Sequence, residues 1–291
     1  MIKSMTGFGR AEQTVNDKAF LVEIKSLNGK LLDLNLKIPP LIKPYEFEIR
    51  NMIQEHLVRG SIECFITIRQ NGSIKPVVIN TDLIKSYYAQ IKDLAKELSV
   101  DSEGVLAALL RLPEVVTPSN EILSENDWEG LQKVIMKAIE DINVHREAEG
   151  KVLHDELELR IKNIQKQEQK ILELEPKRKI KIKNDMIKTL EEHIQNNLYD
   201  ANRLEQEIIY YIEKIDIREE QVRLKNHCEY FLQMLDGDET SNGKKLSFLL
   251  QEIGREINTT GSKAYDADIQ KCVVLMKDEL EKAKEQTFNV L

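Results

Sequence analysis

The sequence predicts an α+β protein in which a mixed α and β N-terminal domain is followed by long helices and a helical C-terminal domain. In the first 70 residues, apolar side chains recur at every second position, which is typical of half-buried strands. From about Thr81 onward, their spacing is that of amphipathic helices. The chain has 291 residues, which exceeds the usual size of one domain and favours about two.

Three strands and one helix are expected in the N-terminal part. Apolar residues alternate with others over residues 20–25 and 62–68, as in strands with one buried face. Residues 34–38 predict a further strand, which two prolines end. A helix is expected at about residues 44–57, because it begins with a proline, which is favoured in the first helical turn.

A near-heptad apolar stripe predicts a very long helix that ends near Pro176, with charged residues on its other faces. Such a stripe fits a coiled-coil seam between subunits, or a helical hairpin that closes on the next segment. We favour a hairpin that also supports oligomerisation. The stripe consists of Trp128, Leu131, Ile135, Ala138, Ile142, Leu153, Leu157, Ile161, Ile164 and Ile171.

Three more helices are expected after a restart beyond Pro176, at about residues 202–235, 245–259 and 266–290. The turn-forming residues 236–243 predict the clearest loop of the C-terminal half. The resulting parts are an N-terminal α+β domain that continues into the long helix, a helical connector with a basic segment, and a helical C-terminal domain. Their expected bounds are 1–155, 156–205 and 206–291.

Composition excludes several classes of protein. No segment approaches the roughly 20 apolar residues of a membrane span, and the N-terminus becomes polar too early for a signal peptide, so we expect a cytoplasmic protein without membrane contact. The three cysteines form no CxxC pair and are expected to be buried free thiols.

The formal net charge of −8 conceals a basic stretch, and a local field is what attracts phosphate. This stretch contains Lys177, Arg178, Lys179, Lys181, Lys183 and Lys188, with Asp185 as the acid that interrupts it.

Two segments concentrate residues that can carry chemistry. On one continuous helix, Asp216, Glu220, Arg223 and His227 would share a face, and Glu219 would adjoin it. Carboxylates and a histidine can hold a divalent metal or move protons, and arginine can steady a phosphate. The plainer interpretation is a solvated helix with ordinary ion pairs.

The second segment, residues 243–263, places Glu252, Arg255, Glu256 and Thr259 beside an apolar stripe. A helix C-cap explains the residues that follow nearly as well as a phosphate site does.

Several long motifs make the sequence resemble the YicC/YloC family. They are MIKSMTGFGRAE, VEIKSLNGKLLDLNLKIP and HLVRGSIECFITI near the N-terminus, REAEGKVLHDEL in the middle, and DIREEQVRLKNH, GKKLSFLLQEIGREINTTGSK and ELEKAKEQTFNV near the C-terminus. The resemblance extends over essentially the whole chain. It implies endoribonuclease activity that depends on a divalent metal, with Mn²⁺ favoured, and a ring-shaped hexamer that encloses RNA.

Several positions depart from the family pattern. The pattern S-x-N-H-R reads Ser26, Leu27, Asn28, Gly29 and Lys30 here, so an imidazole is lost and lysine replaces a bidentate arginine. Four further replacements occur: Lys244 for arginine, Ser247 for aspartate, Gly254 for asparagine and Lys284 for arginine.

The resemblance and the charge clusters together predict metal-assisted cleavage of a phosphodiester bond, with one or two Mn²⁺ or Mg²⁺ ions. The predicted metal ligands are Glu219, Glu220, Glu252 and Glu256. The predicted catalytic set is Glu220, Arg223, His227, Arg255 and Glu256, in which the arginines clamp the phosphate and the histidine is a metal ligand or general base. The predicted RNA-binding residues are Lys30, Lys177, Arg178, Lys179, Lys181, Lys244, Lys245 and Lys263.

Two other functions remain open at this point. A non-catalytic RNA-binding adaptor would deliver transcripts to another nuclease, and the changes from arginine to lysine favour it. A structural scaffold would use the same charged clusters only as ion pairs between subunits. Clusters of acids, arginine and histidine on two separate helices favour the enzyme, because a scaffold does not require them.

Overall fold

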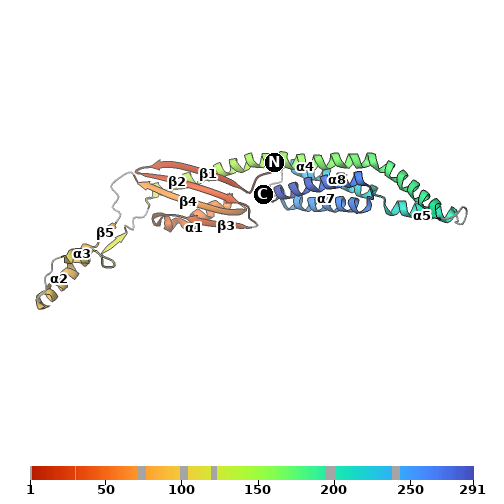
Figure 1. The fold of residues 1–291 in the computed structure, drawn as a ribbon. Helices are drawn as coiled ribbons and strands as arrows, with labels where there is room; N and C mark the ends of the chain where they lie inside the picture. Colours follow the sequence, from red (N-terminus) through yellow and green to blue (C-terminus); the bar gives the residue numbers. More distant parts are fainter. Residues whose placement is uncertain are drawn as a thin grey trace.

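The computed structural model describes residues 2–29, 31–70, 77–98, 104–118, 123–193, 201–237 and 243–291. The molecule is elongated (Figure 1). A sheet domain and a helical bundle lie end to end, and both chain termini lie between them (Figure 1). A small arm extends from the sheet, and a helical tip extends from the far end of the bundle (Figure 1). The predicted α+β class is confirmed.

The sheet has four strands in the order β1-β2-β4-β3. They are β1 (Gly7–Val15), β2 (Lys18–Leu27), β3 (Leu32–Lys37) and β4 (Gly60–Gln70). β2 pairs antiparallel with both β1 and β4, and β3 pairs parallel with β4. The three predicted strands are confirmed. β1 was not predicted, because its glycines and polar residues give little apolar alternation.

One face of the sheet packs against two helices, and the other face is exposed. Phe20, Val22 and Ile24 point into the core, whereas Lys25 and Leu27 are exposed. A 3₁₀ turn, η1 (Pro40–Tyr45), leads into α1 (Glu46–His56), so the predicted helix is confirmed with a start slightly later than expected. The isoleucines of α1 share this core with the N-terminal part of α4 (Glu125–His193).

The arm contains a short antiparallel pair, β5 (Val77–Ile79) and β6 (Val116–Pro118), and two helices. These helices are α2 (Thr81–Leu98) and α3 (Val105–Leu109). No residue of α2 is buried, although the helix is amphipathic. The sequence pattern predicted helices here but not the strands, since three residues are too few to show a period.

Helix α4 is 69 residues long and continues through Pro176. The prediction that it ends near Pro176 and then restarts was therefore wrong. A proline removes one backbone donor and is a usual cause of a helix bend, not always of a break. Figure 1 shows α4 bending over the last part of its length, at the far end of the bundle.

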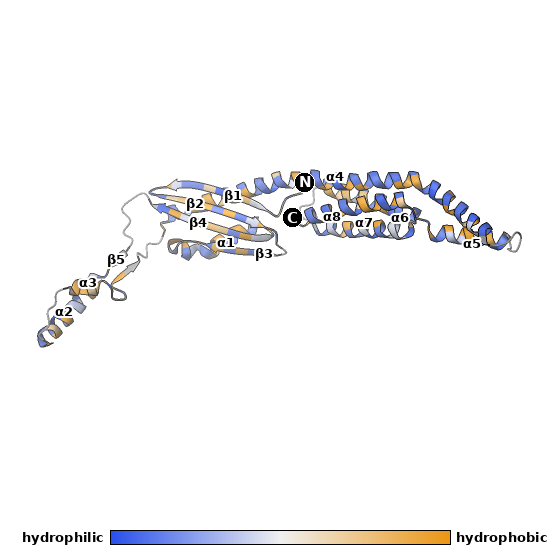
Figure 2. Ribbon diagram, in the orientation of Figure 1, coloured by the Kyte–Doolittle hydropathy of each residue, from blue (hydrophilic) through white to orange (hydrophobic). Residues whose placement is uncertain are grey.

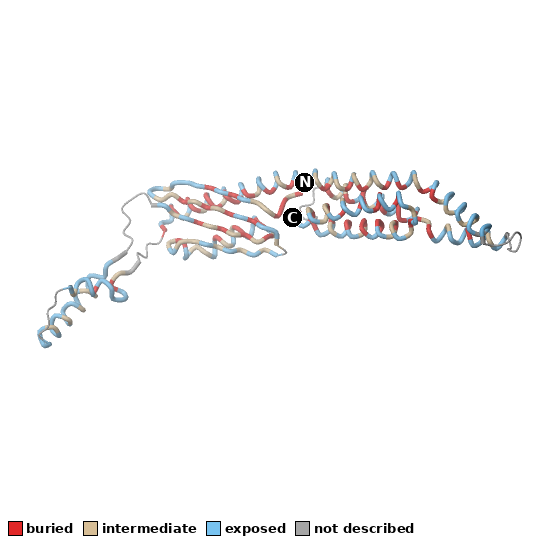
Figure 3. Tube along the Cα trace, in the orientation of Figure 1, coloured by how far each residue is buried: buried red, intermediate tan, exposed pale blue. Residues whose placement is uncertain are grey.

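The bundle is formed by α4 together with α6 (Arg218–Asp236), α7 (Gly243–Lys263) and α8 (Ala267–Thr287). Hydrophobic residues recur along these helices (Figure 2), and buried residues recur along them in the same way (Figure 3). Asp266 caps α8 by accepting hydrogen bonds from the backbone of Asp268 and Ile269.

The prediction of a single helix over residues 202–235 was wrong, because the helix is interrupted between α5 (Ala201–Lys214) and α6. Ile215 and Ile217 are both buried at the break. The carboxylate of Asp216 accepts a hydrogen bond from the backbone N–H of Arg218 at 2.9 Å. Such a local side-chain bond competes with helical hydrogen bonding and favours a turn.

The apolar stripe of α4 serves two separate hydrophobic cores. Its members from Leu131 to Ile142 lie in the sheet core, and those from Leu153 to Ile171 lie in the bundle core. Later helices of the same chain cover the second part, so the stripe there packs within the chain and forms no coiled-coil seam.

The cysteine prediction is confirmed, since Cys64, Cys228 and Cys272 are all free and buried. Burial raises the pKa of the Cys64 thiol to about 12, which keeps it protonated and unreactive at neutral pH. Among the described residues, no helix is both long and apolar enough to cross a membrane.

Gly9 allows β1 to lie directly on α4. A Cβ atom at this position would be 2.2 Å from the carbonyl oxygen of Ala138 and 2.7 Å from the backbone nitrogen of Ile142. We expect Gly9→Ala to lower the free energy of unfolding by about 1–3 kcal/mol, because strand or helix must shift. Urea denaturation measures this loss. Gly237→Ala is the matched control, since its nearest backbone contact would be 3.4 Å; equal losses in both variants would contradict the close-packing argument.

Candidate functional site

A cluster of charged residues closes the end of the bundle that lies away from the sheet. We call it the end cluster. It consists of Glu175, Arg178 and Lys179 of α4, Asp216 and Arg218 at the break, Glu220 of α6 and Lys263 of α7. Four residues of the predicted site, Arg178, Lys179, Glu220 and Lys263, are therefore brought together here.

Arg178 is the most enclosed member of the end cluster, with a side chain that is 1% exposed. Its Nε and Nη2 donate to the two carboxylate oxygens of Glu175 at 2.7 and 2.9 Å. The guanidinium also donates to the carbonyl oxygens of Ile215 at 2.8 Å and Lys263 at 3.2 Å. These carbonyls belong to helix C-terminal ends, which lack helical partners and favour a cation. Arg178 therefore joins three helix segments, and in this conformation it presents no surface to RNA.

Glu220 is buried at the start of α6 and is only half satisfied. Its Oε1 accepts from Nζ of Lys263 at 2.7 Å, and the same ammonium donates to the carbonyl oxygen of Asp216 at 3.1 Å. Its Oε2 has no hydrogen-bond partner among the described residues. A buried carboxylate oxygen without a donor is costly, so this atom suits a cation or a water.

The neighbouring Gln221 repeats this pattern. Its Nε2 donates to Oγ1 of Thr260 at 3.1 Å, which ties α6 to α7. Its Oε1 is buried, and no described residue donates to it. Two consecutive residues thus each keep one unpaired acceptor oxygen inside the bundle.

Asp216 remains ionised at the edge of the end cluster. Burial alone would raise the pKa of its carboxyl group, but hydrogen bonds from Arg218 and the charge of Lys179 outweigh burial and hold the pKa well below its usual range. Its Oδ2 lies 2.7 Å from Nη2 of Arg218 and 3.3 Å from Nζ of Lys179. Asp216 thus neutralises two cations and does not share a helix face with Glu220, contrary to the prediction from a continuous helix.

The other predicted catalytic residues are distributed over α6 and α7. Glu256 is buried one turn before Thr260, and its carboxylate forms no hydrogen bond or ion pair with another described residue. Glu219 forms an exposed ion pair with Arg223 at 2.5 Å. His227 is half-buried on α6.

On α7, Glu252 is half-buried and Arg255 is exposed. Within the described ranges, no group of three or more histidine, cysteine, aspartate or glutamate side chains is close enough to hold a metal ion. The four predicted metal ligands therefore form no complete cage of protein groups in one chain.

The remaining predicted RNA-binding residues differ in availability. Lys177 and Lys181 are exposed on α4, and Lys244 and Lys245 are exposed at the start of α7. Lys179 is held by Glu175 at 3.5 Å and by Asp216. Lys30 lies outside the described residues.

Two departures from the family pattern contact one another. A Cβ atom on Gly254 of α7 would lie 3.0 Å from Cδ2 of Leu280 and 4.0 Å from Nζ of Lys284, both on α8. A larger side chain at residue 254 would therefore point at the side chain of residue 284. The replacement of asparagine by Gly254 and that of arginine by Lys284 thus occur at one contact.

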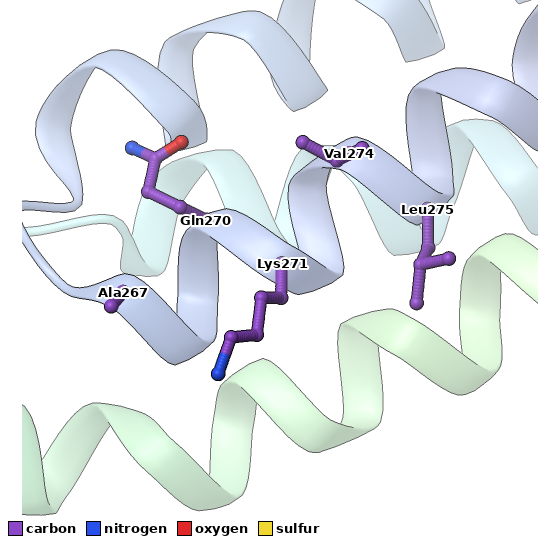
Figure 4. Close-up of a pocket in the computed structure, with 5 residues that line it drawn as sticks. All are labelled: Ala267, Gln270, Lys271, Val274 and Leu275. Carbon is purple, nitrogen blue, oxygen red and sulfur yellow. The ribbon is translucent and has the colours of Figure 1, made fainter.

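The groove in Figure 4 carries none of the candidate catalytic residues. It lies on α8 and is lined by Ala267, Gln270, Lys271, Val274 and Leu275 (Figure 4). Its lining contains no acid, histidine or thiol. This groove is therefore not a candidate for the predicted acid-dependent chemistry.

The sequence prediction missed Glu175, which pairs with Arg178, and Gln221, which follows Glu220 in the sequence. It also assigned no role to Arg146. Glu175 precedes Arg178 by three residues, which is an ion-pair spacing that was visible in the sequence. Arg146 lies in the motif REAEG, but its burial could not be seen without the neighbouring segments.

The pair formed by Glu220 and Lys263 can be tested by a double-mutant cycle. Lys263→Met should lower the free energy of unfolding by about 2 kcal/mol, because it leaves a buried carboxylate unpaired. Since the Lys263 side chain is 32% exposed, this is less than the roughly 3–5 kcal/mol expected for a fully buried pair. The double variant Glu220→Gln, Lys263→Met should recover most of the loss in urea denaturation.

Lys271→Met is the matched control, since it breaks an exposed ion pair with Asp268 and should change stability by about 0.5 kcal/mol or less. A double variant as unstable as Lys263→Met alone would show that Glu220 does not need the lysine charge.

Comparison with known proteins places the chain in a family. Residues 2–155 match the N-terminal region of the endoribonuclease YicC-like family, and residues 171–291 match its C-terminal region. The chain is 31% identical to a probable endoribonuclease YicC of Clostridioides difficile over the full length of both chains. It is 29% identical to a probable endoribonuclease YicC of Haemophilus influenzae, again over both full lengths. With its two regions matched in order along the whole chain, this protein belongs to the endoribonuclease YicC-like family.

Proposed function

We propose that this chain is a metal-dependent endoribonuclease that cleaves single-stranded or hairpin RNA in cytoplasmic RNA turnover. Family membership supports the endoribonuclease activity. The observation that carries the proposal is the pair of buried acids Glu220 and Glu256, which lie on helices packed against each other. Oε2 of Glu220 is buried and has no hydrogen-bond partner within the described part of the chain, and a carboxylate oxygen of this kind suits a cation.

The donor set fits a hard divalent cation. Mg²⁺ and Mn²⁺ prefer oxygen ligands, and Mg²⁺ commonly takes only one or two carboxylates together with water and substrate phosphate. Oε2 of Glu220 and Oε1 of Gln221 are unpaired acceptors, and Glu256 adds a second carboxylate. Of the other predicted ligands, Glu219 directly precedes Glu220, and Glu252 lies four residues before Glu256. A set of this kind suits an ion whose remaining ligands are phosphate oxygens of the RNA and water.

A bound Mn²⁺ or Mg²⁺ would neutralise phosphate charge and activate water or the ribose 2′-hydroxyl. The protein groups have separate tasks. Lys263 holds one oxygen of Glu220 and so fixes the direction of the other. Arg255, exposed on α7, and Arg223, exposed on α6, are the two guanidinium groups that we propose to contact the scissile phosphate. His227 takes the role of a metal ligand or general base.

We further propose that the protein acts as a homo-oligomer, a hexamer by family resemblance. The arm supports this proposal, because α2 carries apolar side chains that nothing in the described chain buries. Tyr88, Leu94 and Leu98 are among them.

The second candidate function is a non-catalytic RNA-binding adaptor. The observation that favours it is that the described residues of one chain assemble no group of three metal-binding side chains. An adaptor binds RNA and leaves it intact in Mn²⁺, whereas the proposed enzyme shortens it. Incubation of purified protein with a short labelled hairpin RNA and Mn²⁺, Mg²⁺ or chelator therefore separates the two.

Glu220→Gln and Glu256→Gln should each reduce cleavage by at least about 100-fold, because even outer-sphere partners of a metal contribute 10–100-fold. RNA binding should persist, since it depends on other residues. Cleavage of the labelled hairpin is measured by gel electrophoresis, and binding by fluorescence anisotropy. Glu285→Gln, at an exposed position of α8, is the control and should retain activity. Full activity of both test variants would remove these acids from the mechanism.

The exposed basic residues of α4 should contribute to binding through phosphate contacts. The double variant Lys177→Gln, Lys181→Gln should reduce the slope of log K against log salt by about 1.4, which is about 0.7 for each contact with single-stranded RNA. Titrations at several salt concentrations measure this slope.

A matched control exists on the same helix. Lys133 and Lys137 are exposed and have the same spacing of four residues, but they lie beside the sheet. Their double substitution by glutamine should leave the slope unchanged. Equal effects of the two pairs would show that overall charge, and not the basic run, attracts the RNA.

A further inference from the structure

The N-terminal segment lies between the sheet domain and the bundle and binds to both. The backbone of Met5 donates to the carbonyl oxygen of Asn289 at 2.8 Å, and the backbone of Leu291 donates to that of Lys3 at 2.9 Å. Ser4 and Val290 form an antiparallel bridge. Residues 3–5 thus form a short strand pair with the end of the chain that follows α8.

The same segment is pressed against α4. The backbone of Ser4 donates to the carbonyl oxygen of Arg146 at 3.0 Å, and Oγ1 of Thr6 donates to Oε1 of Glu149 at 2.9 Å. A Cβ atom on Gly150 would lie 2.3 Å from the carbonyl oxygen of Ile2. Only glycine therefore allows this approach, which fixes the N-terminal segment to one place on α4.

Arg146 of α4 is buried where the N-terminal segment meets the sheet domain. Its residue exposure is 1%, and its Nη2 donates to the carbonyl oxygens of Met5 at 3.4 Å and Arg59 at 3.2 Å, and to Oγ of Ser26. Oγ of Ser26 in turn donates to the carbonyl oxygen of Met5 at 2.7 Å. One guanidinium therefore links α4 to β2, to the residue before β4 and to the N-terminal segment.

This guanidinium has an unusual set of partners. No carboxylate in the described part of the chain forms an ion pair with Arg146, and its Nε has no acceptor there. A buried cation without a counter-ion destabilises a fold compared with an apolar side chain of similar volume. Its directional bonds nevertheless specify a geometry that apolar packing cannot, as other buried polar groups do. The hydrogen bonds of Arg146 therefore serve to fix the orientation of the segments that they join, more than to stabilise the fold.

We propose that Arg146 is a positioning residue for RNA cleavage, which holds the sheet domain in one orientation relative to the bundle that carries Glu220 and Glu256. Only its catalytic consequence rests on the proposed function. If one domain holds the RNA and the other cuts it, the position of the RNA at the cleaving residues depends on how the two domains are oriented relative to each other. A displacement of about 1 Å can reduce a rate by about 100-fold.

The test compares three variants of the full-length chain. Arg146→Met keeps an unbranched side chain, although a shorter one, and removes the donors, whereas Arg146→Lys keeps the charge but loses the planar fork. Lys151→Met is the matched control, because it removes one positive charge from an exposed position of the same helix. Circular dichroism and thermal melting establish that each variant is folded.

Orientation is measured on the protein alone, between nitroxide labels at Gln13→Cys on β1 and Lys277→Cys on α8. Both positions are exposed, and the three native cysteines are buried. We expect a narrow distance distribution for the parent and for Lys151→Met, and a broadened one for Arg146→Met. Cleavage by Arg146→Met at saturating RNA should fall by at least about tenfold with little change in KM. Arg146→Lys should lie between the parent and Arg146→Met in both measurements.

Two results would overturn the proposal. An unchanged distance distribution in Arg146→Met would show that the residue does not set the orientation. A broadened distribution with full cleavage would show that cleavage does not need it. Should Arg146→Met fail to fold, Ser26→Ala removes one acceptor and leaves the guanidinium in place. The same two criteria then apply to Ser26→Ala and Arg146→Lys.

The distance measurement needs neither metal nor RNA, so its outcome is separate from that of the glutamate variants. An inactive parent with a narrow distribution that broadens in Arg146→Met would contradict the proposed endoribonuclease activity and the role in cleavage, while leaving the orienting role intact.

Discussion

Helix α4 is the constraint on which the rest of the structure depends, because one continuous element forms a wall of two hydrophobic cores. Its side chains from Leu131 to Ile142 fill the core beneath the sheet, and those from Leu153 to Ile171 fill the core of the bundle. A helix is a stiff rod with a fixed rise and rotation for each residue. The two domains therefore have a fixed spacing along α4, and the contacts of the N-terminal segment add a second connection between them.

The two buried arginines of the described chain bind carbonyls where backbone segments end or meet. Arg178 satisfies carbonyls at the ends of two helices, and Arg146 satisfies carbonyls of two segments beside the sheet. Helix ends and loops leave carbonyls that no neighbour in the chain can satisfy, and a guanidinium supplies several donors in a fixed geometry. Each buried arginine thus joins segments that apolar packing alone would hold less specifically.

Glu220 differs from these arginines, because only one of its two oxygens is paired. The lysine that pairs with it, Lys263, was predicted to bind RNA, so one predicted catalytic residue lies beside a predicted RNA-binding residue in the end cluster. This half-satisfied acid is the reason for proposing this end of the bundle as the place of chemistry. The exposed basic residues Lys177 and Lys181 lie on α4 close in sequence to its three members of the end cluster.

The sequence by itself determined the α+β class, three of the four main strands, the stripe of the long helix and the buried thiols, because each depends on a local period or composition. Only the tertiary structure decided that α4 continues through Pro176, that the helix is interrupted at residues 215–217, and which of the neighbouring basic residues are buried. In the sequence, Lys177 and Arg178 belong to one uniform run, yet one is exposed and the other enclosed. The physical reason is that burial depends on the rotational phase of a helix against its neighbours, and contacts made more than 80 residues apart set that phase.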